Sequence, residues 1–332
     1  MDRRLVEAAV TSRPGEFELI AELFAPLAKA PGAFGLLDDA ALLGPREGQE
    51  LVVTVDAVVE GVHFLPDDPP DAIAKKALRV NLSDLAAKGA EPAGYLLALV
   101  LPNTKDMDWL GAFARGLQED QAEFGIALLG GDTAATPGPL TISITAFGWV
   151  PGGTMIRREG AVPGDRVFVS GTLGDAGAGL ALLKGEARTA RSEWLVARYR
   201  LPQPRLALGR ELRGLAGAAL DVSDGLVADL GHIALASKVR IAIDAAALPR
   251  SQALRALWGE GNEAIVRAAT AGDDYELAFA APEAKREAVQ AAAERAGVAV
   301  TEVGRVEAGQ GVALLDPAGR ALPVSRAGYS HF

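Results

Sequence analysis

The chain has 332 residues, of which 49% are hydrophobic and 23% charged, and this composition suits two globular domains with cores of Ala, Leu and Val. Its formal net charge of −10 disfavours binding to nucleic acid or anionic membranes through bulk electrostatics. The absence of cysteine excludes disulfides, thiolate metal ligands and a cysteine nucleophile, and three histidines leave little for a zinc site. Any bound metal should therefore be a hard cation with oxygen ligands.

The sequence predicts neither a signal peptide nor a membrane span. Residues 1–10 include Asp2 and Glu7 and lack the apolar core that a signal peptide needs. Apolar runs such as residues 95–101 fall far short of the roughly 20 residues that cross a bilayer. We therefore expect a cytoplasmic protein.

Hydrophobic periodicity predicts a mixed α/β arrangement for residues 1–150. Apolar residues at helical spacing from Phe17 to Leu27 indicate a helix over 16–29 that is bent or interrupted at Pro26. Further helices are predicted over 71–88 and 109–121, and strands over 51–56, 96–101, 126–129 and 141–148. The break at residues 151–153, Pro-Gly-Gly, marks a domain boundary, which gives domains 1–150 and 151–332.

The second predicted domain, residues 151–332, has an α+β pattern. Strands are predicted over 166–170, 219–223, 239–243, 277–280 and 298–303, and helices over 174–184, 206–216, 226–237 and 283–296. No internal repeat interrupts either domain. The fold class is therefore two-domain, α/β followed by α+β.

Six short segments place aspartates beside glycine, serine or threonine: 38–39, 54–56, 81–84, 130–133, 221–224 and 272–275. Each segment alone is typical of a helix cap or a turn. Asp56 and Asp132 are expected to follow apolar strands, Asp84 lies in a largely apolar helix, and Asp221 interrupts an apolar run. Carboxylates drawn toward a core are tolerated only when they are paired or bound to a metal.

The scarcity of histidine favours Mg²⁺ as that metal, because Mg²⁺ accepts carboxylates, waters and phosphate oxygens. Leaving seven aspartates out of the count takes the net charge from −10 to −3, so a single metal site built from them would account for much of the acidity: Asp38, Asp39, Asp56, Asp84, Asp132, Asp221 and Asp224. The chain has neither a P-loop Gly-Lys-Ser/Thr step nor a Rossmann glycine fingerprint. The glycines at 171, 174, 177 and 179 follow a strand and are compatible with a phosphate cradle or, more simply, with close helix packing.

The aspartate segments and their neighbours occur in an order that resembles the thiamine-monophosphate kinase family, within the superfamily that includes aminoimidazole ribonucleotide synthetase and selenophosphate synthetase. The similarity covers nearly the whole chain, and the matching segments are 15–17, 38–41, 56, 60–64, 76–86, 130–133, 221–226, 274–277 and 328–332. No one segment is decisive, but the ordered set is highly specific.

The resemblance implies an N-terminal mixed-sheet domain that binds ATP and Mg²⁺ and pairs with a second copy, so that sheets from two chains form a barrel. The C-terminal α+β domain would complete the active site. The implied activity is ATP-dependent phosphorylation of thiamine monophosphate to thiamine diphosphate, the final step of thiamine diphosphate biosynthesis, by a homodimer that uses several Mg²⁺ ions. K⁺ is a further candidate cofactor. No nucleic acid or membrane partner is implied.

The resemblance also implies roles for individual residues. The metal ligands would be Asp39, Thr54, Asp56, Asp84, Asp132, Asp221 and Asp224, with ATP contacts from Gly131, Arg158 and Ser223 and substrate contacts from His63, Asp273 and Arg326. From the sequence alone, His63 also fits a histidine that caps a turn, and Arg158 a solvated turn arginine. The chain departs from the family pattern at Leu37, Val55, Asp273 and Arg326, where glycine, a hydroxyl residue, glutamate and an aromatic residue are usual.

The acceptor phosphate has a second pKa of about 6 and is largely dianionic at neutral pH, so direct in-line transfer needs no general base. Three alternatives stay open. The chain is compatible with a sister ATP-using enzyme of the superfamily, with a nucleotide-binding regulator that has lost catalysis, or with a metal-dependent phosphatase. Selenophosphate synthetase is disfavoured because the reactive cysteine is absent, and aminoimidazole ribonucleotide synthetase because residues 274–277 and 331–332 follow the kinase pattern.

Overall fold

The structure is a computed structural model that describes residues 15–38 and 40–330. The described residues form two compact units that are discontinuous in sequence. Unit 1 comprises the described residues up to Gly44, Asp56–Ala77 and Gly94–Thr145, and unit 2 comprises Pro45–Val55, Leu78–Ala93 and the described residues from Ala146 onward. Within the described residues, none of the helices has the length and hydropathy of a membrane span.

The first described segment is a series of short helical turns. α1 (Glu16–Leu19) continues into a π-helical turn, η1 (Ile20–Phe24), and a 3₁₀ turn, η2 (Ala25–Leu27), before a second 3₁₀ segment, η3 (Pro31–Leu36). The helix predicted over 16–29 is thus α-helical only over Glu16–Leu19, and the predicted interruption at Pro26 is confirmed. Proline lacks the N–H that would continue the α-helical ladder, so it is accommodated at the start of the 3₁₀ turn.

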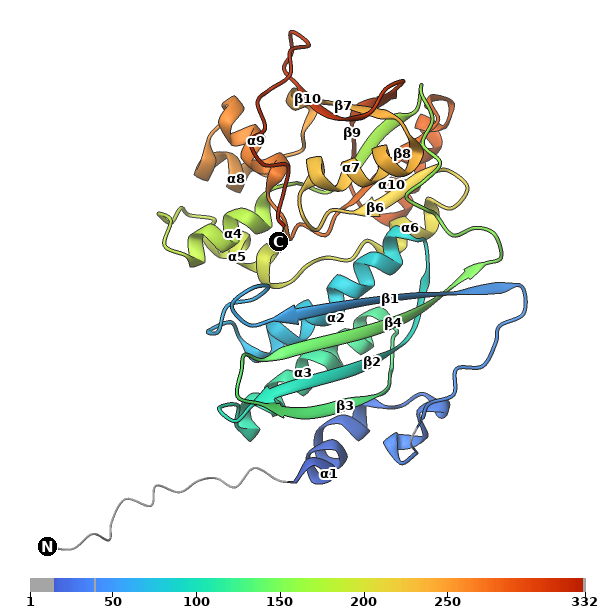
Figure 1. Ribbon diagram of the computed structural model, residues 1–332, viewed down its shortest axis with the longest axis vertical. Coiled ribbons are helices and arrows are strands. Elements are labelled where there is room, and N and C mark those ends of the chain that lie inside the picture. The colour runs from blue at the N-terminus through green and yellow to red at the C-terminus, as the bar shows by residue number, and fades with distance from the viewer. Residues whose placement is uncertain (1–14, 39, 331–332) are drawn as a thin grey trace, which may run out of the picture. The chain divides into compact units, whose positions relative to one another are not determined.

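A four-stranded sheet contains β1 (Gln49–Val59), β4 (Thr141–Pro151), β2 (Glu91–Pro102) and β3 (Leu128–Thr136), in that order (Figure 1). β2 and β3 are parallel, with Ala98 opposite Asp132. β1 and β3 extend beyond their predicted ends, so Asp56 and Asp132 lie within strands and do not follow them. Gly131 permits the extension of β3, because a Cβ there would lie 1.9 Å from the carbonyl oxygen of Leu97.

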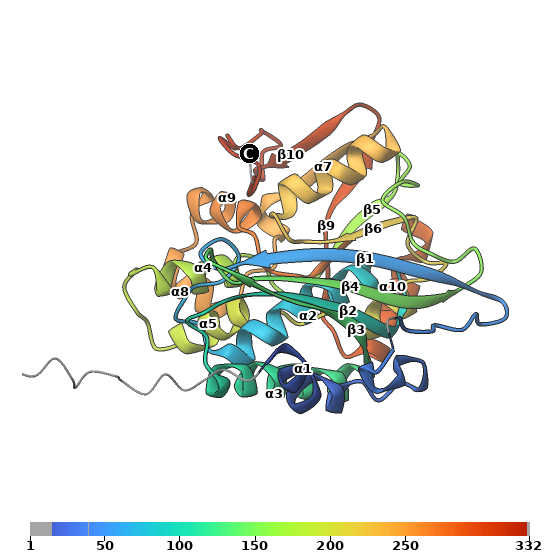
Figure 2. The same ribbon diagram turned by 60° about the horizontal axis from the view of Figure 1, so that its bottom comes forward.

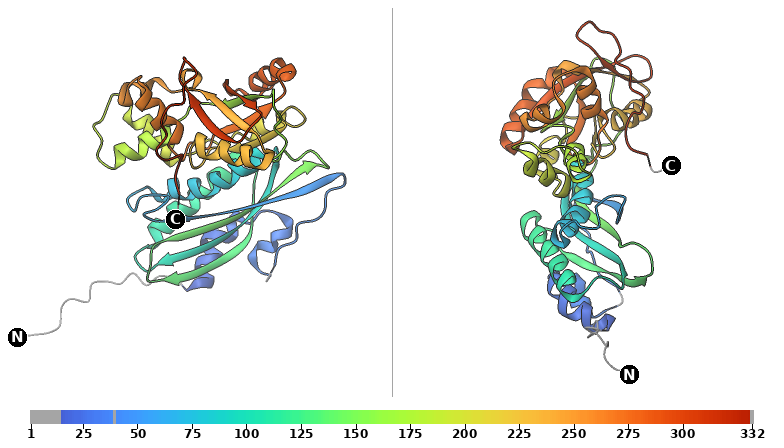
Figure 3. Two further views of the ribbon diagram at one scale, coloured as in Figure 1. Left: turned by 45° about the horizontal axis from the view of Figure 1, so that its top comes forward. Right: turned by 90° about the vertical axis from the view of Figure 1, so that its left-hand side faces the viewer.

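Helices α2 (Pro70–Ala87) and α3 (Met107–Phe124) are close to the predicted ranges. The carboxylate of Asp106 caps α3 by accepting from the N–H of Trp109 at 2.8 Å, and Gly125 ends the helix in the left-handed conformation. α3 runs along one face of the β2–β3 pair in unit 1 (Figures 2 and 3). Its Phe113 and Leu117 are fully buried, which explains the helical periodicity of the sequence.

Unit 2 contains a six-stranded sheet with the order β10-β7-β9-β5-β8-β6. The strands are β5 (Arg166–Ser170), β6 (Ala218–Asp221), β7 (Arg240–Asp244), β8 (Leu277–Ala281), β9 (Val300–Glu307) and β10 (Gly311–Leu315). Neighbouring strands are antiparallel except β10 and β7. The predicted strands of this domain are confirmed, and β10 was not predicted.

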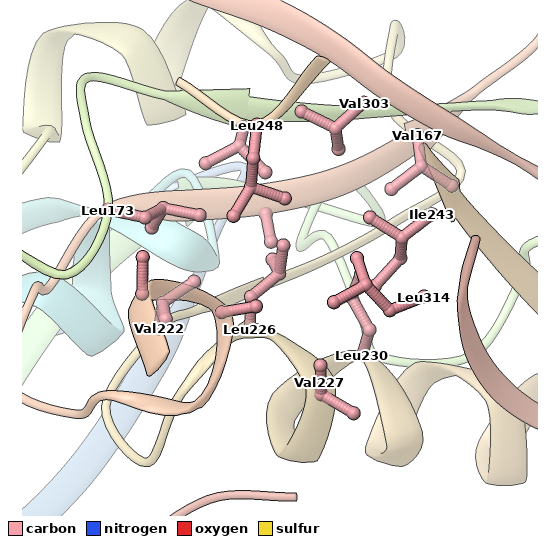
Figure 4. Packing of buried hydrophobic residues seen from close by; sticks show 14 of the residues in the cluster. Val167, Leu173, Val222, Leu226, Val227, Leu230, Ile243, Leu248, Val303 and Leu314 are labelled. Carbon is pink, nitrogen blue, oxygen red and sulfur yellow. The ribbon is translucent and has the colours of Figure 1, made fainter. Parts of the chain in front are cut away.

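The helices of unit 2 are α4 (Asp175–Leu183), α5 (Ser192–Arg200), α6 (Leu206–Glu211), α7 (Leu226–Ser237), α8 (Gln252–Trp258), α9 (Asn262–Thr270) and α10 (Arg286–Ala296), with 3₁₀ turns η4 (Ala245–Ala247) and η5 (Glu283–Lys285). α6 ends five residues before its predicted end, and α5, α8 and α9 were not predicted. Figure 4 shows Leu226 and Leu230 of α7 packed beside Ile243 and Leu314 of the sheet. This core positions the β6–α7 connection, where several expected site residues lie.

Candidate active site

Unit 2 brings Thr54, Asp84 and Asp221 into one neighbourhood with a residue that the sequence did not single out, Lys88. The hydroxyl of Thr54 on β1 donates a short hydrogen bond to Oδ2 of Asp84 on α2. Lys88 follows the end of α2, four residues after Asp84, and its ammonium donates to the backbone carbonyl of Ala219 on β6 at 2.9 Å. Lys88 therefore connects α2 to the strand that ends at Asp221.

The ammonium of Lys88 lies among charged groups of both signs. The pKa of Lys88 is lowered to about 8, mainly by burial and then by the positive charge of Arg158, and the carboxylates of Asp221 and Asp84 oppose the shift. Two expected metal ligands and one expected ATP contact thus share a neighbourhood with one cation. The i,i+4 spacing of Asp84 and Lys88 is the sequence signal that would have identified this lysine.

The loop between β6 and α7 carries Ser223 and Asp224, and a buried carboxylate of α7 holds it. Oδ2 of Asp229 accepts from the backbone N–H groups of Ser223, Asp224 and Gly225 at 3.0, 3.0 and 3.1 Å. Burial and the nearby charge of Asp224 raise the pKa of Asp229 to about 7, although the three N–H donors oppose the shift. The loop is therefore fixed by hydrogen bonds to its backbone, which leaves the side chains of Ser223 and Asp224 for other partners.

The segment before β8 carries Asp273 and lies beside the same loop. The N–H of Asp273 donates to the carbonyl oxygen of Ser223 at 2.8 Å, and the N–H of Tyr275 donates to that of Val222 at 2.8 Å. Asp273 and Tyr275 have φ values of +68° and +49°, in the left-handed region that non-glycine residues rarely adopt. An expected substrate contact thus lies in a strained segment next to expected metal and ATP contacts.

Buried polar residues around Glu276 form a network, and the sequence identified Glu276 only as part of a family motif. Glu276 accepts hydrogen bonds from Arg198 at 2.9 Å, from Nε of Arg205 at 2.7 Å and from the hydroxyl of Ser170 at 2.6 Å. Nη2 of Arg205 makes a second, short contact with the same carboxylate. Asp274 and Glu276 directly precede the apolar strand β8 (Leu277–Ala281), and this position is the signal that could have revealed the network.

Asp274 and Asp175 are further buried carboxyl groups in unit 2. Oδ2 of Asp274 accepts from the N–H of Gly174 at 2.6 Å, and Asp175 accepts from the hydroxyls of Thr172 and Ser251. Burial raises the pKa of Asp274 well above its usual value, and it also raises the pKa of Asp175. The N-terminus of α4 is thus occupied by a carboxyl group of the protein itself.

The glycine series before and within α4 serves packing. A Cβ at Gly177 would lie 2.6 Å from Cβ of Ala271, and one at Gly179 would lie 2.2 Å from the carbonyl oxygen of Leu195. Since Asp274 already occupies the N–H groups at this helix terminus, close helix packing explains these glycines better than a phosphate cradle does.

The expected site residues of unit 1 lie apart in the sheet. Asp56 is on β1 and Asp132 on β3, the two outer strands of the four-stranded sheet. His63 lies in the turn that follows β1, where its Nδ1 accepts from the N–H of Val59 at 3.1 Å. Gly131 precedes Asp132 on β3. The structure therefore agrees with the interpretation of His63 as a histidine that caps a turn.

Two further expected site residues, Asp39 and Arg326, lie near the ends of the chain. Asp39 lies outside the described residues. Arg326, near the C-terminus, is exposed, donates to the carbonyl oxygen of Ser330 at 3.3 Å and lies over the ring of Tyr329. Across residues 15–38 and 40–330, no group of three or more His, Asp or Glu side chains is arranged to hold a metal ion. The oxygen donors Thr54, Asp84 and Asp221 nevertheless have the chemistry that Mg²⁺ prefers.

Comparison with known proteins identifies the family. Residues 37–150 match the family described as AIR synthase related protein, N-terminal domain, and residues 162–316 match the corresponding C-terminal domain. The thiamine-monophosphate kinase of Caulobacter vibrioides is 47% identical over 328 residues, which cover 98% of this chain and 93% of that protein.

Two solved structures are similar along most of the chain. The crystal structure of thiamine-monophosphate kinase from Stenotrophomonas maltophilia K279a superimposes with a TM-score of 0.79 at 46% identity, covering 86% of this chain and 91% of that one. AaThiL in complex with AMPPCP and TMP superimposes with a TM-score of 0.76 at 34% identity, covering 96% of this chain and 97% of that one. The chain therefore belongs to the thiamine-monophosphate kinase family of enzymes.

Proposed function

We propose that this chain transfers the γ-phosphoryl group of ATP to the phosphate of thiamine monophosphate and so makes thiamine diphosphate, the final step of its biosynthesis. The observation that carries the proposal is the near full-length similarity to AaThiL in complex with AMPPCP, an ATP analogue, and TMP. The need for ATP makes the proposed reaction a cytoplasmic one. We further propose that the chain divides into domains near residues 151–153.

The proposed transfer is direct and in line, because the acceptor phosphate is already largely ionised. The protein must then bring two anions together and stabilise charge on the transferring group. Thr54, Asp84 and Asp221 provide oxygen atoms that would hold Mg²⁺, which when bound supplies the positive charge that two phosphate groups require. Lys88 and Arg158 add fixed positive charge to the same neighbourhood.

The other proposed roles follow the family pattern. Asp39, Asp56, Asp132 and Asp224 are the remaining proposed metal ligands, Gly131, Arg158 and Ser223 the proposed ATP contacts, and His63, Asp273 and Arg326 the proposed substrate contacts. Several Mg²⁺ ions, with K⁺ as a further candidate, are the proposed cofactors. The proposed ligands come from separate strands and loops, and a carboxylate binds an ion only at short range. Several ions are therefore favoured over one.

A homodimer is proposed from the exposed edge of the four-stranded sheet. Alternate residues of the outer strand β1, Leu51, Val53 and Val55, are 43%, 55% and 60% exposed, and they form an apolar stripe that a second copy would cover. Asp56 and Asp132, on opposite outer strands, are roughly 14 Å apart from the spacing of neighbouring strands. This separation is too large for one ion within one chain, so pairing of two sheets in a barrel would let such carboxylates meet.

The oligomeric state is tested by replacing an exposed residue of the stripe. We expect the wild-type chain to sediment as a dimer, and we expect Val53→Glu to shift the equilibrium toward monomer because it places a charge in the apolar contact. The control Val162→Glu alters an equally exposed valine outside the stripe and should leave the dimer intact. A monomeric wild type at micromolar concentration would reject the dimer.

The activity is tested by incubating the purified chain with ATP, Mg²⁺ and thiamine monophosphate and separating the thiamine esters by chromatography. We expect the wild type to form thiamine diphosphate and Asp84→Asn to lose it. Asp71→Asn, which removes a carboxylate from the first turn of the same helix, is the control and should retain activity. Free phosphate as the only product would indicate a phosphatase, whereas ATP binding without turnover would indicate a regulator or a sister activity.

A further inference from the structure

We propose that Asp274 is a positioning residue, whose buried carboxyl group holds its neighbour Asp273 in place for thiamine monophosphate. This inference rests on the proposed function and extends it to a residue that contacts no substrate. Contacts of Asp274 hold the strained segment 273–275 in place, and we expect their loss to lower the affinity for thiamine monophosphate selectively.

The strain lies on both sides of Asp274. Asp273 has φ +68° and Tyr275 has φ +49°. Non-glycine residues in this region cost on the order of 1–3 kcal/mol each and persist only where the surrounding structure enforces them. Relaxation of either residue would redirect the chain at Asp273, so the segment needs strong external contacts.

The carboxyl group of Asp274 supplies the first of these contacts. Its two oxygens accept from the N–H groups of Gly174 at 2.6 Å and Ala176 at 3.2 Å, at the N-terminus of the nine-residue helix α4. The side chain is only 1% exposed, so water does not compete for these donors. Gly174 itself has φ +84°, and a Cβ there would lie 2.8 Å from Cα of Ala268, which limits any movement of the helix terminus.

The backbone supplies the second set of contacts. Asp273 and Tyr275 donate to the carbonyl oxygens of Ser223 and Val222, and Val222 donates to that of Glu276 at 2.8 Å. The guanidinium of Arg198 donates to the carbonyl oxygen of Asp274 at 3.2 Å and to the carboxylate of Glu276. Asp274 is thus held on its side chain and its backbone, and the half-buried Asp273 beside it donates its N–H to the Ser223 loop.

This arrangement separates two tasks between adjacent carboxyl groups. Asp274 is committed to the helix terminus and cannot reach a ligand, whereas Asp273 carries the contact to substrate. Weakening the attachment of Asp274 lets Asp273 leave its left-handed conformation, and the affinity for thiamine monophosphate falls. ATP is affected less, because Asp229 independently holds the loop of its proposed contact Ser223 by accepting from the N–H groups of Ser223, Asp224 and Gly225.

The test is a steady-state comparison of wild type with Asp274→Asn, which keeps the shape but has one acceptor oxygen in place of two. We expect KM for thiamine monophosphate to rise about tenfold, equivalent to about 1.4 kcal/mol, with KM for ATP within about twofold of wild type. The matched control is Asp165→Asn, because Asp165 is also buried and accepts from the N–H of Val162 at 3.0 Å in a turn before β5. This control should lose stability without a change in either KM.

A second pair of variants does not alter Asp274. Tyr275→Gly lets the backbone adopt right- and left-handed conformations equally well. Tyr275→Asn removes the same ring, but asparagine adopts the left-handed conformation less readily than glycine. We expect KM for thiamine monophosphate to rise severalfold more in the asparagine variant than in the glycine variant, because glycine adopts the native left-handed conformation at lower cost.

Each outcome separates the inference from the proposed function. Thiamine diphosphate formation by wild type together with an unchanged KM in Asp274→Asn would reject the inference alone. An equal rise of both KM values in Asp274→Asn and Asp165→Asn would also reject it, because that result indicates general destabilisation. A wild type that forms no thiamine diphosphate would overturn the proposed function and the inference together.

Discussion

The buried carboxylate of Glu276 provides the strongest stability prediction, through the substitution Glu276→Gln. Glu276 is 1% exposed and accepts from two arginines and a serine hydroxyl. Glutamine has the same shape but no charge, and its NH₂ group must face a donor on one side. Ser170 can rotate its hydroxyl to accept, but the guanidinium groups cannot accept at all.

The magnitude follows from the arginine that remains. Arg198 is buried, so the substitution removes the carboxylate that pairs with its positive charge away from water. Breaking one side of a buried pair costs about 3–5 kcal/mol, most of it from the uncompensated charge. Arg205 is more exposed and can recover part of its hydration, which places the expected loss toward the lower end of that range.

The assay is urea unfolding followed by circular dichroism, with Glu283→Gln as the matched control. Glu283 also pairs with an arginine, Arg166, at 2.8 Å, but its side chain is 57% exposed, so its loss should cost less than about 1 kcal/mol. We expect the midpoint of Glu276→Gln to fall well below that of the control at unchanged slope. Equal midpoints for the two variants would refute the reasoning that burial, and not the ion pair itself, sets the cost.

Two further predictions concern pH and glycine packing. Burial raises the pKa of Asp175 above its unfolded value, so the folded state retains a proton that the unfolded state loses, and the free energy of unfolding declines as pH rises above about 4. Asp175→Asn should remove this decline, so its stability relative to wild type should be higher at pH 8 than at pH 4.5 in urea unfolding, and a constant difference would contradict the shift. Gly209→Ala should lower the melting temperature and cost about 1–3 kcal/mol, because the new Cβ would lie 1.9 Å from the carbonyl oxygen of Ala86. Gly111→Ala, in the interior of α3 with no atom closer than 3.6 Å, should instead stabilise by up to about 1 kcal/mol, and a loss there would show that α3 is packed more tightly than the structure indicates.

Long periodic segments were predictable from the sequence with good boundaries. The helix expected over 226–237 is α7 (Leu226–Ser237), and the strand expected over 166–170 is β5 (Arg166–Ser170). In both, the apolar residues that set the period are buried in one core. The ordered aspartate segments also identified the family correctly, because their order along the chain is specific to that family.

Other elements were not predictable because their formation depends on neighbours distant in sequence. The helices α5, α8 and α9 have only nine, seven and nine residues, too few turns to establish a clear helical period, and they pack against other helices. The Gly130-Gly131 step is typical of a turn, yet it continues β3 because Leu97 of the adjacent strand approaches too closely for a side chain. Only the neighbouring strand β2 shows that these glycines continue a strand and do not form a turn.

The sequence by itself determined the family and the periodic elements, since motif order and period are local properties. The tertiary structure decided which groups meet. Lys88 reaches the carbonyl oxygen of Ala219, 131 residues away, and Asp274 reaches the helix terminus at Gly174, 100 residues away. Neither contact can be predicted from the neighbouring residues, because a hydrogen bond between residues so far apart in sequence forms only when the whole core brings them together. The same packing decides which carboxylates are buried, which are paired and which stay available for a ligand.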